Sequence, residues 1–432
     1  MKRLLLVSYA FPPQLNPGGL LLLRRVKELV RLGWRLTVLT IDTSATLERL
    51  DPQLAEELPP SLEVVRTGRA LSPLFAIPGL TKMILKSLTV LGMPEMTFPW
   101  YFFARKADRG VLSGRDFSAI YSHALPYVSN VAGLALKRRT GLPWVANFSD
   151  PWMDNPYLSF TPIQRRLSSR LEKAVIREAD AVIFETSQTA EAVLRKYPRA
   201  WMDKVHIIPP GYGLNLFEDL NLTPAPRKRL RLVYTGMFYP GKRTPETLLQ
   251  ALQSLQRTRP LAEQLEVRLI GPFAPDYQPL AQSLGLGEVV TCSGPIPLAA
   301  CMQEAAAADV LLVIDAPSDT PSLFLPSKLV DYLAFKKPIL GLTPNVGASA
   351  DLLRQLGCPV VAPDDPEAIA RAVAELLDHW LAGELTVSPD FAAVAPNYDI
   401  RQTTRILHRI LQGLISPGSP ELLTPDQAVN ID

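Results

Sequence analysis

The sequence predicts an α/β protein built from two Rossmann-like domains. Short runs of Leu, Val and Ile, each of strand length, alternate with longer segments of helical period along most of the chain. This alternation is typical of parallel sheets that are covered by helices on both faces. The runs fall into two series of six, and 432 residues are enough for two domains that each bury a core.

The expected strands follow one another along the chain as two series. Those of the first half are "RLLLVSY", "RLTVLTI", "SAIYSH", "WVANFS", "AVIFET" and "VHIIP". Those of the second half are "LRLVYTG", "EVRLIG", "VVTCSG", "VLLVID", "PILGL" and "PVVA".

The domain boundaries follow from breaks in these patterns. A stretch with Pro, Gly and Asn but no sustained period separates the two series, and the last helix follows a break at a proline. The predicted parts are a first domain at 1–209 with an irregular insertion at about 70–110, a hinge at 210–229, a second domain at 230–395, a final helix at 396–415 and a disordered tail at 416–432.

Composition narrows the class of function. The 45 basic and 42 acidic side chains leave a formal net charge of only +3, so no global field attracts nucleic acid and any anion site must be local. The three cysteines, Cys292, Cys301 and Cys358, lack the short spacing of a zinc site, and we expect reduced core residues in a cytosolic protein. No apolar run reaches the roughly 18 residues of a spanning helix, and the apolar start is too short for a signal peptide.

Two glycines stand where the first strand passes into a helix. In "SYAFPPQLNPGGLLLLRRV", Gly18 and Gly19 open the helical segment, where backbone amides can approach an anion without a Cβ in the way. A tight strand-to-helix turn explains the pair equally well. Neither the dinucleotide pattern G-x-G-x-x-G nor the phosphate loop G-x-x-x-x-G-K-[ST] occurs, which argues against a dehydrogenase or a nucleotide triphosphatase.

The second half carries two cationic motifs next to predicted strand ends. "VYTGMFYPGKRTPE" places Gly236, Lys242 and Arg243 between a strand and a helix, an arrangement that suits a diphosphate but also suits solvated surface charge. In "LPSKLVDYLAF", Lys328 lies in the first turn of a helix that begins near Ser327, where the helix dipole disfavours a cation. Either a bound anion or an ion pair with Asp331, three residues later, accounts for this lysine.

Polar side chains also stand at strand ends in the first half. His123 in "YSHALPY" and Asp150 in "NFSDPW" come at the carboxyl ends of two successive predicted strands. That edge of an open α/β sheet is where ligands bind. Helix capping or an ordinary surface position is the alternative for each residue.

A segment of the insertion has a mixed character. Residues 79–106 combine Leu, Ile, Met, Phe and Trp with Lys82, Lys86, Arg105 and Lys106, as an interfacial membrane segment does. An ordinary buried helix is the alternative explanation.

Taken together, these motifs resemble those of the GT-B glycosyltransferases, specifically the family 4-like group. The resemblance runs from the start of the chain to about residue 415, and it rests on "FPP...GG", "SDPW", "IPPGY", "TG...GKR" and "LPSKLVDYLAFKKPIL" in this order. It implies two Rossmann-like domains that face each other across a cleft, with the final helix crossing back to the first domain. It also implies a retaining, metal-independent transfer of a sugar from a nucleotide-diphosphate donor, with no further cofactor.

The resemblance assigns roles to the candidate residues. Lys242 and Arg243 would neutralise the donor diphosphate, Ser327 and Lys328 would cradle it, and Asp331 would hold the ribose hydroxyls. The resemblance also places Gly236 in the donor loop. It implies that His123, Asp150 and Lys242 are catalytic, and that Gly18 and Gly19 place backbone amides near the donor or the acceptor.

The chain departs from the family pattern at three positions. Leu323 stands where a glutamate is common, Met237 where an arginine is common, and Gly213 where an aspartate is usual. The leading hypothesis is a cytoplasmic transferase for a glycan, lipid-linked or small-molecule acceptor in surface polysaccharide or glycolipid synthesis, with peripheral contact to the inner face of the membrane left open. The alternatives are an inactive GT-B-like scaffold subunit and a nucleotide-sugar epimerase.

Overall fold

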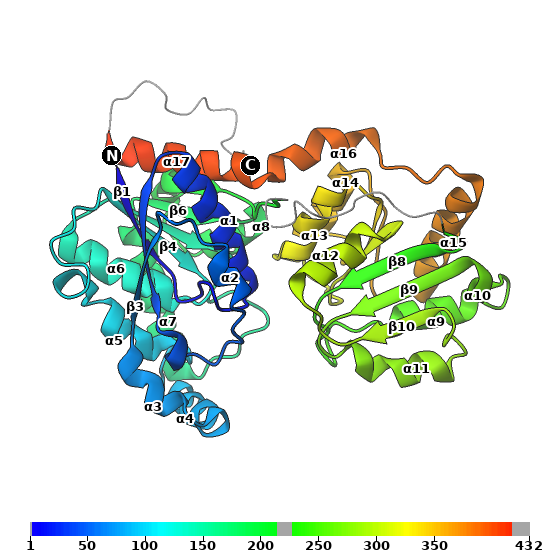
Figure 1. The fold of residues 1–432 in the computed structure, drawn as a ribbon, viewed down its shortest axis with the longest axis horizontal. Coiled ribbons are helices and arrows are strands. Elements are labelled where there is room, and N and C mark those ends of the chain that lie inside the picture. The colour runs from blue at the N-terminus through cyan, green and yellow to red at the C-terminus, as the bar shows by residue number, and fades with distance from the viewer. Residues whose placement is uncertain (1, 214–226, 417–432) are drawn as a thin grey trace. The chain divides into compact units, whose positions relative to one another are not determined.

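The computed structural model describes residues 2–213 and 227–416, which form two α/β units (Figure 1). Unit 1 contains the chain up to Gly211 and the segment from Ile400 onwards, whereas unit 2 runs from Tyr212 to Asp399. Each unit is built on one parallel sheet, which confirms the predicted fold class. Most of the predicted hinge at 210–229 and nearly all of the predicted tail at 416–432 lie outside the described residues.

Unit 1 has a seven-stranded sheet in the order β3-β2-β1-β4-β5-β6-β7. Its strands are β1 Arg3–Val7, β2 Arg35–Ile41, β3 Glu63–Thr67, β4 Ala119–Ala124, β5 Trp144–Phe148, β6 Ala181–Phe184 and β7 Val205–Ile207. Its helices are α1 Pro17–Arg31, α2 Gln53–Glu56, α3 Ser72–Phe75, α4 Pro78–Val90, α5 Tyr101–Ala104, α6 Val128–Thr140, α7 Pro162–Glu178, α8 Ser187–Leu194 and α17 Ile400–Ile415.

The two faces of this sheet have separate apolar cores. Successive side chains of a strand point to opposite faces, so Leu6 of β1 packs toward α1 and α17 while Val7 packs toward α6 and α7. Because both faces are buried, the strands are continuous apolar runs rather than alternating ones. This is why most of them could be predicted from the sequence.

The sheet of unit 1 contains one strand that was not predicted, and the insertion at about 70–110 contains helices. The sequence "EVVRT" forms β3 at the edge of the sheet, and it was not predicted because all five residues are only half-buried and no apolar run marks it. The irregular stretch at 70–110 contains α3, α4, α5 and short 3-10 turns, with no strand among them.

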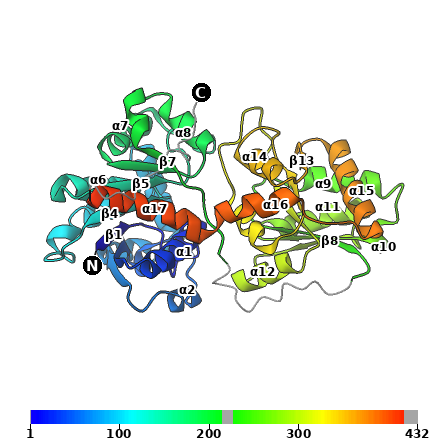
Figure 2. The ribbon, with the colours of Figure 1, turned by 90° about the horizontal axis from the view of Figure 1, so that it is seen from above.

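The C-terminal helix α17 packs on unit 1 beside α1 (Figure 2). Leu407 and Leu411 are fully buried in the core beneath it. Trp34, just before β2, donates a 2.9 Å hydrogen bond from Nε1 to Nδ1 of His408. The end of the described chain is therefore an integral part of the first unit.

Unit 2 has a six-stranded sheet in the order β10-β9-β8-β11-β12-β13, and all six strands match predicted runs. The strands are β8 Leu230–Thr235, β9 Leu265–Ile270, β10 Val290–Ser293, β11 Val310–Ile314, β12 Ile339–Leu342 and β13 Val360–Val361. The helices are α9 Glu246–Leu255, α10 Leu261–Gln264, α11 Gln278–Ser283, α12 Leu298–Ala306, α13 Ser327–Tyr332, α14 Ala348–Gln355, α15 Pro366–Ala382 and α16 Pro389–Val394.

Helices cover both faces of the second sheet as well. Leu249 of α9 and Val373 of α15 share one core with alternate residues of the strands. Leu329 of α13 and Leu353 of α14 share the other. Among the described residues, no helix is long and apolar enough to cross a membrane, and the three cysteines are free thiols.

Candidate functional site

The order of the strands locates the ligand edge of each unit. In unit 2 the chain runs outward from β8 through β9 to β10 and then returns to place β11 on the other side of β8. In unit 1 the same reversal falls between β1 and β4. Open α/β sheets bind ligands at the carboxyl ends of the strands beside such a reversal. The loops after β8 and β11, and those after β1 and β4, are therefore the places to look.

Lys328 of α13 reaches this edge of unit 2. Its Nζ donates a 2.8 Å hydrogen bond to the hydroxyl of Tyr234, near the end of β8, and lies 4.1 Å from the centroid of that ring. Burial lowers the pKa of Lys328 well below its usual range, and the positive charge of Arg243 lowers it further while Asp315 opposes the shift. Contact with Tyr234 therefore accounts for the position of this lysine.

Arg243 is the second cation at this edge, and it is held on two sides. Its Nη1 lies 3.8 Å from Oδ1 of Asp315, which directly follows β11, and its guanidinium lies 4.7 Å from the ring centroid of Tyr239. Asp315 is buried and accepts a 3.0 Å hydrogen bond from the hydroxyl of Thr343 after β12. The arginine is thus fixed before any ligand arrives, which limits the entropy lost on binding.

Two glycines bring the loops after β8 and β9 into backbone contact. Gly236 has a φ of +154°, and a Cβ there would lie 2.6 Å from Nζ of Lys328. A Cβ on Gly271 would lie 2.2 Å from the carbonyl oxygen of Gly236. At Gly271 the obstruction is backbone, so no side chain fits there, whereas a side chain at Gly236 would displace the amine of Lys328.

The remaining residues predicted for unit 2 lie around this centre. Lys242 is exposed in the turn that the backbone of Tyr239 and Arg243 closes, and Ser327 is exposed at the start of α13. Asp331 is half-buried on the same helix. Arg243 is close enough to Lys328 to lower its pKa.

The departures from the family pattern, and two partners that were not predicted, also fall here. Leu323 is half-buried in the loop before α13, and Met237 is 39% exposed after Gly236. Gly213 is described only as a half-buried residue at the end of the first segment. Asp315 and Tyr234 were not predicted as site residues, although both belong to predicted strands that end at this edge.

In unit 1 His123 is completely buried near the end of β4. Its Nδ1 lies 3.4 Å from the hydroxyl of Tyr121, and its Nε2 has no hydrogen-bond partner among the described residues. A Cβ on Gly18 would lie 3.9 Å from Nε2, so the ring edge faces the first turn of α1. Burial, with a smaller effect of the nearby Arg25, lowers the pKa of His123 to about 3, and the imidazole is therefore neutral at pH 7.

Asp150 follows β5 and stands beside a further carboxyl group that was not predicted. Burial raises the pKa of Asp150 to about 6. Glu185 directly follows β6 and is 8% exposed; burial raises its pKa to about 7, with Asp150 adding to the rise and Arg25 opposing it. The sequence did place Glu185 at the end of a predicted strand, "AVIFET".

Gly18 and Gly19 begin α1 as expected. The side chain of Asn16 caps the helix by accepting a 2.9 Å hydrogen bond from the amide of Gly18. Gly19 is buried against the loop after β1, where a Cβ would meet backbone atoms of that loop at 3.6 to 3.7 Å. The two glycines therefore have a local structural role, and nothing in their geometry conflicts with an anion nearby.

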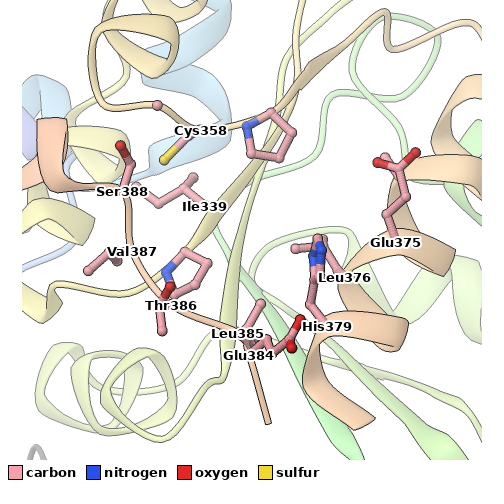
Figure 3. Close-up of a pocket in the computed structure, with 14 residues that line it drawn as sticks. Ile339, Cys358, Glu375, Leu376, His379, Glu384, Leu385, Thr386, Val387 and Ser388 are labelled. Atoms are coloured by element: carbon pink, nitrogen blue, oxygen red, sulfur yellow. The ribbon is translucent and has the colours of Figure 1, made fainter. Parts of the chain in front are cut away.

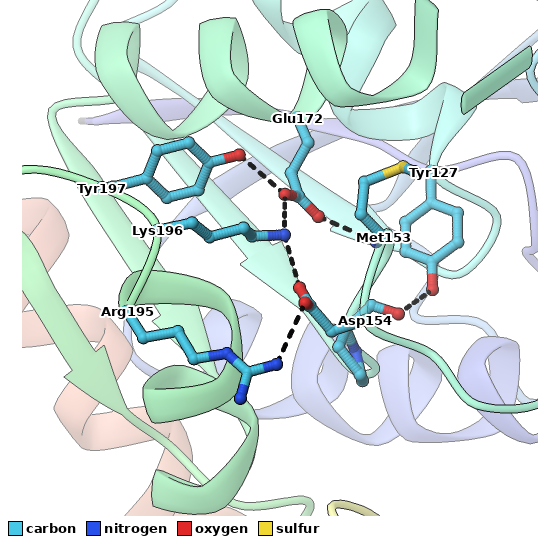
Figure 4. Close-up of polar contacts among 8 residues, drawn as sticks. Tyr127, Met153, Asp154, Glu172, Arg195, Lys196 and Tyr197 are labelled. Carbon is cyan, nitrogen blue, oxygen red and sulfur yellow. Dashed lines mark hydrogen bonds and ion pairs between the residues drawn. The ribbon is translucent and has the colours of Figure 1, made fainter. Parts of the chain in front are cut away.

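A network of polar contacts holds the segment that carries Asp150 (Figure 4). The amide of Met153 donates a 2.9 Å hydrogen bond to Glu172 of α7, a fully buried carboxylate that also accepts from Tyr197 and Lys196 at 2.7 Å. Lys196 also binds Asp154. The "SDPW" segment is therefore anchored to α7 and to the residues after α8.

Aromatic packing fixes the same segment from the other side. Tyr127 stacks on the buried Trp152 with ring centroids 4.8 Å apart, and its hydroxyl donates a 2.7 Å hydrogen bond to the carbonyl of Pro151. Ser149 donates to the carbonyl of Ala124 at 2.6 Å. Asp150 thus lies between anchored neighbours at the edge of the sheet.

A pocket of about 340 Å³ in unit 2 lies elsewhere (Figure 3). Ile339 and Cys358, at the amino ends of β12 and β13, form one side, and His379 and Glu375 of α15 form another. This is the edge of the sheet opposite to Lys328 and Arg243. The pocket has no cation comparable to those two residues, and we do not assign it to the donor.

No group of three or more His, Cys, Asp or Glu side chains is placed to hold a metal ion in the described part of the chain.

Comparisons with solved structures identify the class of fold. The chain aligns with a sucrose-phosphate synthase from Thermosynechococcus elongatus over 96% of its own length and 99% of the other, with a TM-score of 0.68 and 18% identity. A glycosyltransferase from Rickettsia africae gives a TM-score of 0.65 at 13% identity, with 96% and 99% covered. The Anabaena protein HepE in complex with UDP gives 0.62 at 17% identity, with 96% and 100% covered. The two Rossmann-like units have the GT-B fold of glycosyltransferases.

Family models extend this result to the sequence. Residues 22–211 match the glycosyl transferase 4-like domain, and residues 229–379 match the glycosyl transferases group 1 domain. The chain belongs to the family 4-like GT-B glycosyltransferases.

Curated relatives are similar over only part of their length. A D-inositol 3-phosphate glycosyltransferase from Arthrobacter sp. (strain FB24) is 29% identical over 197 residues, which are 42% of this chain and 44% of that protein. One from Stackebrandtia nassauensis is 30% identical over 138 residues, which are 29% of this chain and 31% of that protein. The chain thus spans less than half the length of these relatives.

We predict that Glu172→Ala destabilises unit 1 by about 2 kcal/mol. The substitution removes the partner of the Met153 amide and the Tyr197 hydroxyl, whereas the partly exposed Lys196 keeps its second carboxylate, Asp154, so the loss falls below that of a fully buried ion pair. Urea unfolding followed by fluorescence measures the change. Lys173→Ala, at an exposed neighbouring position, is the control, and equal stability of the two variants would contradict the anchoring role.

Proposed function

We propose that this protein is a retaining, metal-independent glycosyltransferase that moves a sugar from a nucleotide-diphosphate donor to a hydroxyl-bearing acceptor. The observation that carries this proposal is the pair of preformed cations, Lys328 and Arg243, at the strand-order reversal of unit 2. Asp315 is a single carboxylate that acts on both cations: it lies 3.8 Å from Arg243, and its charge raises the pKa of Lys328, whose hydrogen bond goes to a neutral phenol. An anionic ligand would complete the site.

The chemistry of transfer explains why this arrangement is useful. When the bond from the sugar to the donor breaks, negative charge builds up on the leaving diphosphate and positive charge develops at the anomeric carbon. Fixed cations and amides aimed at the diphosphate stabilise the transition state more than the ground state. Two side-chain cations supply this charge, which is why we propose that no divalent metal is required.

The nucleotide and the acceptor are proposed from similar proteins. Structures of HepE hold UDP and UDP-glucose, and we propose a uridine nucleotide as the first donor to test. The curated relatives are described as acting on D-inositol 3-phosphate, which makes that compound one acceptor for the panel. Synthesis of a surface polysaccharide or glycolipid is the proposed setting.

We predict that Lys328→Met weakens UDP binding by about 10- to 100-fold, the value of one charge-assisted hydrogen bond. Burial lowers the pKa of Lys328, so its charge is lost as pH rises, and the UDP affinity of the wild type should fall at a lower pH than an ordinary lysine would give. Lys328→Arg keeps its charge and should flatten this pH profile. Isothermal titration calorimetry measures both effects.

Lys228→Met is the control, because this exposed lysine lies at the amino end of β8, away from the site. If wild-type protein shows no affinity for UDP or other nucleoside diphosphates, or if the two methionine variants bind alike, the donor site is wrongly placed.

We predict that transfer of the donor sugar persists in excess EDTA, because Lys328 and Arg243 supply the charge that a metal would otherwise provide. Release of UDP in the presence of an acceptor panel, with and without EDTA and Mg²⁺, is the measurement. Loss of all turnover in EDTA with rescue by Mg²⁺ would overturn metal independence. UDP binding without turnover would favour the scaffold alternative suggested by Leu323 and Met237, and a changed donor sugar without acceptor would indicate an epimerase.

Contact with a membrane surface is a second proposal, and it rests on exposed apolar side chains of unit 1. Met83 and Leu91, on and just after α4, are 60% and 74% exposed, Phe102 of α5 is 52% exposed, and Ile163 of α7 is 64% exposed. A Cβ on Gly92 would lie 2.6 Å from Ile163, which shows that the end of α4 and the start of α7 are neighbours.

Basic side chains accompany this apolar surface. Lys82, Lys86 and Lys106 are exposed in the same segment, and such a mixture suits the boundary between headgroups and acyl chains of an anionic bilayer.

We predict that the protein floats with vesicles of phosphatidylcholine and phosphatidylglycerol in a 7:3 ratio, and that the double variant Met83→Glu, Leu91→Glu does not. The two carboxylates would have to enter the interface at a high desolvation cost. Density-gradient flotation measures the bound fraction. Leu381→Glu, at a 52% exposed position of unit 2, is the matched control, and flotation of none or all three of these proteins would contradict the proposed surface.

A further inference from the structure

A group of polar side chains interrupts the apolar core on one face of the unit 1 sheet. Alternate residues of neighbouring strands point to the face that α1 covers, and Tyr121 and Val145 are among them. His123 and Asn147 are paired in register two residues further on, and Glu185 follows β6 with the same alternation. All of these polar residues, together with Arg25 of α1 above them, are at least nine-tenths buried.

Hydrogen bonds connect the inner part of this cluster. Nη1 of Arg25 donates to the hydroxyl of Tyr121 at 2.8 Å and to Oδ1 of Asn147 at 3.4 Å. Four of the five members still have polar atoms without a partner in the described part of the chain, namely Nε and Nη2 of Arg25, Nε2 of His123, Nδ2 of Asn147 and Oε1 of Glu185. Buried polar atoms are nearly always satisfied in folded proteins, so this cluster has unused capacity for a ligand or for water.

The cluster has an inner end with the cation of Arg25 and the neutral His123, and an outer end with two carboxyl groups. Arg25 and His123 are 0% exposed, so a ligand at the edge of the sheet does not reach them first. Glu185 is 8% exposed, and Asp150 after the adjacent strand β5 is half-buried. A ligand that approaches the carboxyl ends of β5 and β6 therefore meets two carboxyl groups.

Resting on the function proposed above, we propose that Glu185 and Asp150 bind the hydroxyl groups of a neutral sugar or polyol acceptor and discriminate against acceptors with an anionic group at that position. Carboxylates accept hydrogen bonds from hydroxyls and repel phosphate or sulfate at close range. Arg25 is a positioning residue, because its charge lies behind Glu185 and keeps a buried carboxylate tolerable in this core.

The ionisation of the two carboxyl groups supports this assignment. Burial and the charge of Asp150 raise the pKa of Glu185 to about 7, while the positive charge of Arg25 opposes the rise. His123 faces the same cluster but is neutral at pH 7. Acidification from pH 8 to pH 5.5 should therefore protonate the carboxyl groups and reduce the discrimination against anions.

Direct binding of matched acceptor analogues tests the proposal. The probes are glucose, galactose and mannose, each with its 6-phosphate and its 6-sulfate, measured by ligand-observed NMR on the full chain with saturating UDP. At pH 8 we expect at least one neutral sugar to bind about tenfold more tightly than its sulfate. The sulfate group keeps a single negative charge from pH 5.5 to 8. Any change with pH in the ratio of the affinities for neutral and sulfated sugar therefore comes from ionisation of the protein.

Variants separate Glu185 from general effects. Glu185→Gln keeps the shape and removes the charge, so the ratio of neutral to sulfated sugar should fall at least about threefold, while UDP affinity, which depends on unit 2, stays unchanged. Glu191→Gln, at an exposed position of α8, should leave the ratio as it is. The pH series on the wild-type protein gives the same test without a mutation, in case Glu185→Gln unfolds the chain.

The outcomes distinguish this inference from the proposed function. If the wild-type protein does not bind UDP, the donor site proposed in unit 2 is wrong, and the proposed function is overturned with it. Normal UDP binding with equal or tighter binding of the anionic sugars, no binding of any neutral sugar, or a ratio that neither Glu185→Gln nor acidification changes, overturns the acceptor assignment alone.

Discussion

Parallel pairing of strands constrains where this protein can place charge. Both faces of each sheet are covered by helices, and burial of an unpaired charge in such a core costs several kcal/mol. Charged groups are therefore tolerated mainly at the two edges where the strands end, because loops and helix ends provide partners there. Lys328 and Arg243 gather at the carboxyl edge in unit 2, and Glu185 and Asp150 gather at it in unit 1.

The two units use the equivalent edge for opposite electrostatic purposes. Unit 2 presents two cations that share the carboxylate of Asp315, and in the proposed donor site an incoming anion would balance the remaining charge. Unit 1 presents carboxyl groups with a guanidinium behind them, and in the proposed acceptor site they would favour a hydroxyl donor over an anion. The proposed reaction, which separates charge between a leaving group and an incoming hydroxyl, would use this contrast.

Much of the fold could be predicted from the sequence because buried parallel strands are unbroken apolar runs. The edge strand "EVVRT" could not, since half-buried residues leave no such run. Lys328 stood out as a cation at the start of a helix, where the local dipole disfavours it. Both Lys242 and Arg243 were predicted from their motif, but the contacts of Arg243 with Asp315 and Tyr239 depend on how one turn closes, which spacing alone does not determine.

The unpredicted residues share a different cause. Arg25 resembles a surface charge on an amphipathic helix, and Glu185 resembles a polar residue that ends a strand. Only the packing of α1 over β4, β5 and β6 shows that both are buried in one cluster. Asp315 likewise stands at the end of a predicted strand. It contacts Arg243, which lies in the loop after a different strand, β8, so the sequence alone does not show the contact.

The backbone contact between Gly236 and Gly271 has a consequence for protein engineering. A Cβ on Gly271 would meet backbone, so substitutions there would cost stability, whereas a side chain at Gly236 would displace the amine of Lys328. Engineering of the proposed donor site would therefore have to start from neighbouring side chains such as Met237 and Tyr239.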